Sequence, residues 1–349
     1  MDAMVDWNLA AKVAEGVAGL SPAGDPEPYQ ALVRPADEAE ALVSEYTGLA
    51  PVAGVLPVAE SIDRKTWIDA NLASIRGVLE PAAEKAAAGA GPLGGVVGGA
   101  AAALLGVQAG GISGFLAGRV LGQYEFPVLD PDAPARLLFV APNLGHAATQ
   151  LETDADRLLR WVALHEITHA LQFGGVPWLR PHLAGMIREL TGALTLDPGQ
   201  LFAGMPGLDD VRGLVETLRE DGLTAAVLGP ERRAQLDGVQ AFMAVLEGYA
   251  EHVMDAVGAD VIDDLPALRA ALERRRADRT GLLRLLERLI GMDMKLRQYE
   301  QGKRFCDGVV ARAGIDGLNR VWERPTQMPT LAELDDPGAW LARTESAAA

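Results

Sequence analysis

The sequence has a single cysteine among its 349 residues, Cys306, so it can form no intrachain disulfide and no cysteine-rich zinc site. Aromatic residues make up only 5%, whereas Ala and Leu abound, and this balance favours helix over strand. Positive charge is also scarce: 31 Lys and Arg stand against 48 Asp and Glu, a formal net charge of -17. Because phosphate backbones bind clustered Lys and Arg, we expect no nucleic-acid partner.

A run with the apolar content of a membrane helix is missing as well. Residues 86–118 carry no charge, but Gly and Ala dominate them and Pro92 interrupts them. Glycines recur at four-residue spacing, as at Gly106, Gly110 and Gly114. Small residues at that spacing let two helix backbones approach closely, in soluble cores as well as in membranes. We therefore expect a buried helical hairpin here, with membrane association as the alternative.

The remaining pattern predicts a mainly α protein with at most a small β-sheet. Hydrophobic residues make up 49% and charged residues 23%, as in ordinary globular proteins. The best strand candidate is Arg136–Ala141, and the pattern is helical from Asp154 almost to the end. We expect a helical N-terminal region (1–130) and a metal-binding region (131–349) that share one core. The acidic N-terminal residues lack the layout of a signal peptide, which predicts a cytoplasmic protein.

The chemistry is carried by His-Glu-Ile-Thr-His at residues 165–169. On a helix, residues four apart lie on one face, so the imidazoles of His165 and His169 can reach one metal ion. Glu166 then lies near the open coordination position, where it can act as general base and acid. We expect a zinc ion here; the alternative is a pair of histidines without a metal.

Two histidines leave the site incomplete, because a catalytic zinc usually has three protein ligands. Glu247 and Glu251 lie four residues apart in a stretch that otherwise looks buried, and buried carboxylates are rare unless they are paired or bound to metal. We predict Glu247 as the third ligand and Glu251 as an acceptor for the N–H of a ligand histidine. Glu251 or His252 as ligand remains open. Gly248 in mid-helix suggests close approach to another backbone.

These residues resemble the gluzincin arrangement, in which the motif is followed far downstream by a Glu-Gly-aromatic-Ala stretch, here starting at Glu247. No Gly-Ala-Met-Glu-Asn exopeptidase motif is present, so aminopeptidase specificity is not implied.

The whole chain resembles the bacterial zincin-like metallopeptidase type 2 family, often described as associated with deazaflavin-coenzyme biosynthesis. The resemblance implies a zincin-like helical core and a hydrolase without an established substrate. The matching stretches are Val5–Trp7, Trp67–Asn71, the Gly-rich run that ends in Leu121–Gly122, Pro142–Asn143, His165–Leu179, Leu246–Asp255, Lys295–Phe305 and Pro329–Trp340.

Further residues could support such a reaction. A zinc hydrolase needs a donor for the oxyanion of its intermediate, and Tyr299 and Arg297 are the candidates, with structural hydrogen bonding as the alternative. Tyr249 is a weaker candidate. The strand at 137–141 could be an edge strand that aligns an extended substrate by backbone pairing, or it could only support the core. His146 and His182 are expected at the surface or in loops.

The sequence therefore predicts a zinc-dependent hydrolase, most simply a peptidase-type enzyme in which Glu166 is the general base for a zinc-activated water. A peptide or a small amide is the expected substrate. The alternative is a non-catalytic scaffold that keeps the fold and the metal site and binds a partner. A non-proteolytic hydrolase of coenzyme metabolism is a third interpretation.

Overall fold

The structure is a computed structural model that describes residues 5–20, 33–88, 94–192, 230–277 and 292–346. The side chains of some residues in these ranges also lie outside the described part, namely those of residues 33, 34, 81–88, 94–101, 191, 192, 230–232, 273, 275–277 and 292–299.

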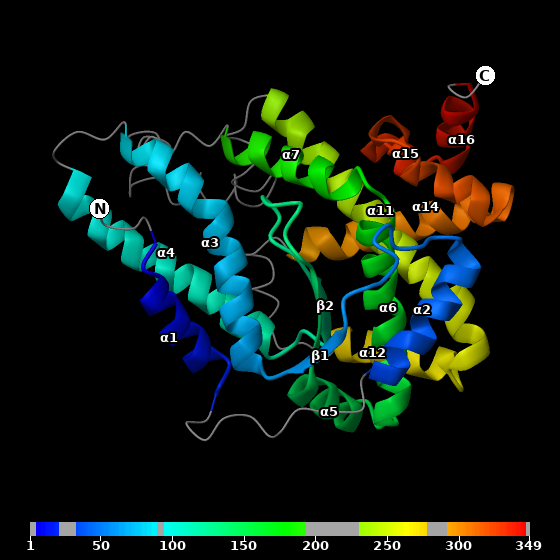
Figure 1. Cartoon of the computed structure of the whole chain (residues 1–349), viewed down its shortest axis with the longest axis horizontal. Helices are drawn as coiled ribbons and strands as arrows, with labels where there is room; N and C mark the ends of the chain where they lie inside the picture. Colours follow the sequence, from blue (N-terminus) through cyan, green and yellow to red (C-terminus); the bar gives the residue numbers. More distant parts are fainter. Residues whose placement is uncertain (1–4, 21–32, 89–93, 193–229, 278–291, 347–349) are drawn as a thin grey trace.

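Within these ranges the chain is mainly helical with one small sheet, as predicted. The elements, labelled as in Figure 1, are α1 (Trp7–Val17), α2 (Val33–Thr47), β1 (Ala59–Ile62), α3 (Arg64–Ala88), α4 (Gly94–Ala117), β2 (Gly122–Glu125), β3 (Arg136–Val140), α5 (Ala141–Gln150), α6 (Ala155–Gly175), α7 (Leu179–Gly192), α11 (Pro230–Val261), α12 (Leu265–Ala277), α14 (Met292–Asn319), two 3-10 turns (Arg320–Trp322 and Pro325–Gln327), α15 (Leu331–Leu334) and α16 (Pro337–Ser346).

The sheet lies between two groups of helices, with α1, α3 and α4 on one side and α2, α6, α11 and α14 on the other (Figure 1). β3 is its central strand, parallel to β1 and antiparallel to β2. Side chains alternate between the faces of a strand. Leu137 and Phe139 accordingly join the core around α6 and α11, whereas Leu138 and Val140 join the core of the N-terminal helices.

This topology corrects one prediction. One of the two interpretations of the strand at 137–141, an edge strand that could align a substrate, is wrong, because β3 has a neighbour on both sides. The two strands of four residues, β1 and β2, form the edges instead. The division at residue 130 stays a prediction; Ala36, Ala39 and Val43 of α2 lie in the larger core.

The glycine spacing in α4 brings two helix backbones together, as predicted, but the partner is α1. A Cβ at Gly106 would lie 2.6 Å from the carbonyl oxygen of Asp6, and Gly110 and Gly114 face the backbone of α1 in the same way. Within the described residues this segment is the single helix α4, in which Leu104 is 60% exposed. Among the described helices, none has the length and apolar character needed to cross a membrane.

Helix α6 runs through the larger core. Asp154 caps its first turn, where the carboxylate accepts the backbone N–H groups of Asp156 and Arg157. Most residues of the helix from Leu158 to Gln172 are buried. Because the core surrounds it, α6 can hold polar side chains in fixed positions.

Helix α11 crosses α14 at two glycines. A Cβ on Gly248 would overlap the backbone of Gly302, and one on Gly302 would overlap the carbonyl group of Ala244. Gly248 therefore approaches another backbone closely, as the sequence suggested. This crossing fixes the position of the neighbouring residue Glu247.

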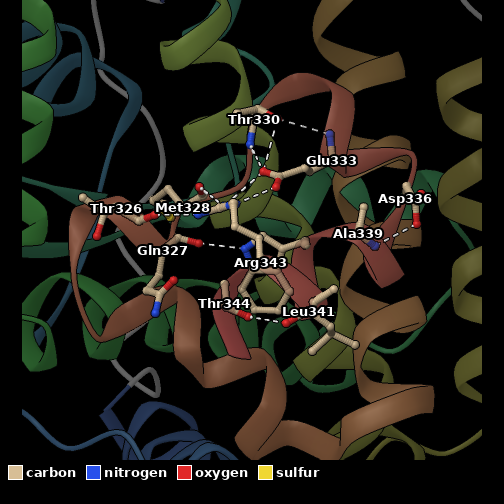
Figure 2. Close-up of polar contacts among 12 residues, drawn as sticks. Thr326, Gln327, Met328, Thr330, Glu333, Asp336, Ala339, Leu341, Arg343 and Thr344 are labelled. Atoms are coloured by element: carbon tan, nitrogen blue, oxygen red, sulfur yellow. Dashed lines mark hydrogen bonds and ion pairs between the residues drawn. The ribbon is translucent and has the colours of Figure 1, made fainter. Parts of the chain in front are cut away.

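The C-terminal segment closes over this part of the core. Figure 2 shows Arg343 of α16 reaching the carbonyl oxygens of Thr326 and Met328 at 2.8 and 3.0 Å and the carboxylate of Glu333. The indole N–H of the fully buried Trp340 donates to the Gln327 carbonyl oxygen at 2.7 Å. Trp340 also packs edge-on against Phe305 of α14.

The glycine crossing can be tested by Gly302→Ala. The added methyl group has no space between α11 and α14, so we expect a loss of about 3 kcal/mol in the free energy of unfolding, measured with denaturant. Gly238→Ala is the matched control on α11, because its Cβ would meet only the Met186 side chain at 3.6 Å. Equal stability of the two variants would contradict the account.

Candidate metal centre

Two helices supply the candidate site. His165, Glu166 and His169 lie on α6, and Glu247 lies on α11, which packs against α6. The four-residue spacing places both imidazoles on one side of α6, as the motif predicts. Glu247 faces them from α11, beside the glycine crossing.

The three predicted ligand side chains converge. The Nε2 atoms of His165 and His169 are 3.1 Å apart, and Glu247 Oε2 lies 3.6 Å from the first and 3.7 Å from the second. In a tetrahedral zinc site with Zn–N bonds of about 2.05 Å, neighbouring ligand atoms are about 3.3 Å apart. The three atoms thus have the chemistry and the spacing of a metal-binding triad.

Hydrogen bonds set the tautomer of His169. The Nε2 amide of the buried Gln172 donates to the carbonyl oxygen of Leu246 at 3.2 Å, so the Gln172 Oε1 atom faces the imidazole. Because Oε1 can only accept, His169 Nδ1, 2.8 Å away, carries a hydrogen and donates it. Its Nε2 atom is left as the nitrogen that points into the triad.

The closeness of the two Nε2 atoms favours a cation between them. Two neutral imidazoles that both carry their hydrogen on Nδ1 would face each other with Nε2 lone pairs, which repel at 3.1 Å; a proton or a metal ion between the two nitrogens removes this repulsion. Burial disfavours charge on His169, but Glu247, Glu166 and the bond to Gln172 outweigh burial and raise its pKa to about 9. The site therefore stabilises positive charge.

Strand β2 covers Glu166. The backbone N–H of Tyr124 donates to Glu166 Oε2 at 2.8 Å, and a Cβ on Gly122 would lie 2.7 Å from Glu166 Cγ. Only a glycine lets the strand pass this close to the carboxylate. Glu166 is buried, and burial raises its pKa above the ordinary value, although the two histidines and the Tyr124 N–H oppose the shift.

Comparison with known proteins places the chain in a family. Residues 5–341 match the zincin-like metallopeptidase family. The chain belongs to this family. A crystal structure from Chloroflexus aurantiacus, described as a "putative hydrolase with a novel fold", shares 31% sequence identity and a TM-score of 0.72. The similarity covers 98% of this chain and 99% of that one. No protein of curated function matches the chain. Family and neighbour together support a hydrolase.

Other residues considered for this zincin-like site lie elsewhere. Glu251 is not in the triad; its carboxylate pairs with Arg269 at 3.2 Å, and His169 Nδ1 contacts Gln172 instead. His252, the other alternative ligand, contacts the Tyr46 hydroxyl at 2.8 Å and Asp307 at 2.7 Å.

The remaining candidates are also placed away from the triad or outside the described side chains. Tyr249 is fully buried, and its hydroxyl donates to Asn319 at 2.7 Å. His182 packs against Trp178 and Phe242, while His146 is exposed on α5. Arg297 and Tyr299 belong to the first turns of α14, but their side chains lie outside the described part, so the oxyanion role stays a prediction.

Sequence reasoning missed three features of this zincin-like site. Gln172 is a polar residue in an apolar stretch, and that exception was its only signal. Met254 reads as an ordinary core residue, yet its sulfur lies 3.1 Å from His165 Nδ1. The short strand β2, with Gly122 and Tyr124 over Glu166, has no alternating pattern that would have predicted it.

The raised pKa of His169 predicts a proton release. In the metal-free protein His169 keeps its proton up to a pH of about 9, and a metal ligand must give it up. Zinc binding near neutral pH should therefore displace about one proton, and the release should vanish above that pKa. Calorimetric titration in two buffers of different ionisation enthalpy measures it. A binding heat that is independent of the buffer near neutral pH would contradict this assignment.

Proposed function

We propose that this protein is a zinc-dependent hydrolase that cleaves an amide bond. The observation that carries the proposal is the convergence of two imidazole Nε2 atoms and one carboxylate oxygen, 3.1 to 3.7 Å apart, next to a buried glutamate. Membership in the zincin-like metallopeptidase family supports the same chemistry.

The donor set suits zinc. Two neutral imidazoles and one carboxylate match the ligand types of catalytic zinc sites, which keep the fourth position for water or substrate. His165, His169 and Glu247 would hold the ion. When bound, zinc supplies a Lewis acid that polarises a carbonyl group and lowers the pKa of water.

Glu166 would be the general base. One oxygen of its carboxylate accepts the Tyr124 N–H, which fixes the side chain beside the triad. Its raised pKa makes it a better proton acceptor near neutral pH than an exposed glutamate. It would take a proton from the attacking water and pass it to the leaving nitrogen.

Partial exposure of the ligands favours an enzyme over a non-catalytic scaffold. The side chains of His165 and Glu247 are each 21% exposed and that of His169 is 12% exposed, so a substrate can reach the triad. A scaffold would need no access. The expected substrate is a peptide or a small amide.

Glu166→Gln separates catalysis from metal binding. The amide keeps the shape of the side chain but cannot take a proton. The rate of hydrolysis should therefore fall by about 10²–10⁴-fold. Zinc content should stay unchanged, because Glu166 is not a ligand. Activity is measured on an unfolded protein substrate and on small amides. A variant with wild-type activity would refute the role of Glu166.

A further inference from the structure

Met254 contacts His165 at Nδ1, the ring nitrogen that points away from the other two predicted ligands. It lies on α11 seven residues after Glu247, and it is fully buried in the larger core. Its Sδ atom is 3.1 Å from Nδ1 of His165. A thioether sulfur carries no hydrogen and can only accept, so the hydrogen bond requires a proton on Nδ1. That tautomer leaves Nε2 as the nitrogen that faces His169 and Glu247.

We propose that Met254 is a positioning residue whose thioether accepts the Nδ1–H of His165 and so presents Nε2 to the metal ion. The inference rests on the proposed zinc site and adds how its first ligand is oriented. Gln172 does the same for His169 with an amide oxygen. The two histidines of the motif thus have acceptors of different strength, one oxygen and one sulfur.

The surroundings explain a sulfur at this position. The contact lies in the larger core, where Leu164 of α6 and Val257 of α11 are buried, and a Cβ on Gly258 of α11 would lie 3.7 Å from the Leu164 side chain. An oxygen acceptor has lone pairs whose burial costs free energy unless each is paired. A thioether packs as an apolar group and still accepts weakly. Met254 therefore orients His165 and completes the apolar contact between the two helices.

The weak acceptor has a consequence for metal affinity. Ligand histidines usually donate to carboxylates, carbonyl groups or water, which makes the ring a stronger ligand, and loss of such a partner lowers metal affinity by about 10–100-fold. Because sulfur accepts more weakly than oxygen, Met254→Leu should weaken zinc binding by roughly tenfold, at the low end of this range. Met254→Gln, which brings an oxygen acceptor to a similar place, should bind zinc at least as tightly as the wild type.

The test uses the full chain and zinc alone. Dissociation constants are measured by competition with a chromophoric chelator for the wild type, Met254→Leu and Met254→Gln. The control is Met186→Leu on α7, a partly buried methionine that packs against the same core outside the triad. Unfolding of each metal-free protein shows whether packing has changed. The visible spectrum of the cobalt(II)-substituted proteins reports the ligand field at His165 without any need for activity.

Weaker zinc binding in Met254→Leu, wild-type binding in Met186→Leu and recovery in Met254→Gln would support the proposal. Equal affinity of Met254→Leu and the wild type would overturn it. Equal weakening in Met254→Leu and Met254→Gln would also overturn it, because the contact would then be packing alone.

A second measurement needs neither a variant nor zinc. In the metal-free wild type with ¹⁵N-labelled histidine, the Nδ1–H of His165 should be present and protected from exchange with solvent. A His165 ring without a hydrogen on Nδ1 would overturn the inference. A wild type that shows this proton but binds no zinc would contradict the proposed function and leave the orienting contact intact.

Discussion

The site depends on a positive charge held between two imidazole nitrogens. His165 and His169 present their Nε2 atoms to each other at 3.1 Å, and Gln172 and Met254 bind the opposite nitrogen of each ring. With the hydrogens held on the far side, the space between the rings favours a cation. Glu247 adds a negative charge at 3.6 to 3.7 Å from both nitrogens. The packing of α6 against α11 holds the two imidazoles and the carboxylate at distances that free side chains would not keep in water.

That constraint explains the construction of the two central helices. α11 supplies Glu247, the Leu246 carbonyl that orients Gln172, and Met254, so it contacts both histidines of α6 from one side. Its own position is set by the glycine crossing with α14, over which the C-terminal segment closes. On the other side, β2 passes close over Glu166 because residue 122 is glycine. The sheet thus supplies the strand that covers Glu166, and helices α6 and α11 supply the three ligand side chains.

Local sequence patterns predicted the histidine pair and the strand, whereas the third ligand and the hydrogen-bond partners of the histidines depend on tertiary packing. The spacing of His165 and His169 follows from helix geometry, so the pair could be placed on one face in advance. The choice between Glu247 and Glu251 depends on how α11 is rotated against α6, which the crossing at Gly248 and Gly302 determines and no local pattern reveals. β3 was predicted because four of its five residues, 137–140, are apolar, but its central place depends on pairing with β1 and β2. The roles of Met254 and Gln172 arise only when the helices meet.

The central claim is that these three side chains form a zinc site, and zinc content tests it most directly. Untagged wild type, Glu247→Gln and Glu251→Gln are dialysed against the same zinc buffer and analysed by plasma mass spectrometry. The account predicts about one zinc per chain in the wild type and in Glu251→Gln, and a large loss in Glu247→Gln, because a catalytic zinc takes three protein ligands. A wild type that takes up no zinc, or a Glu247→Gln variant that keeps it in full, would contradict the account.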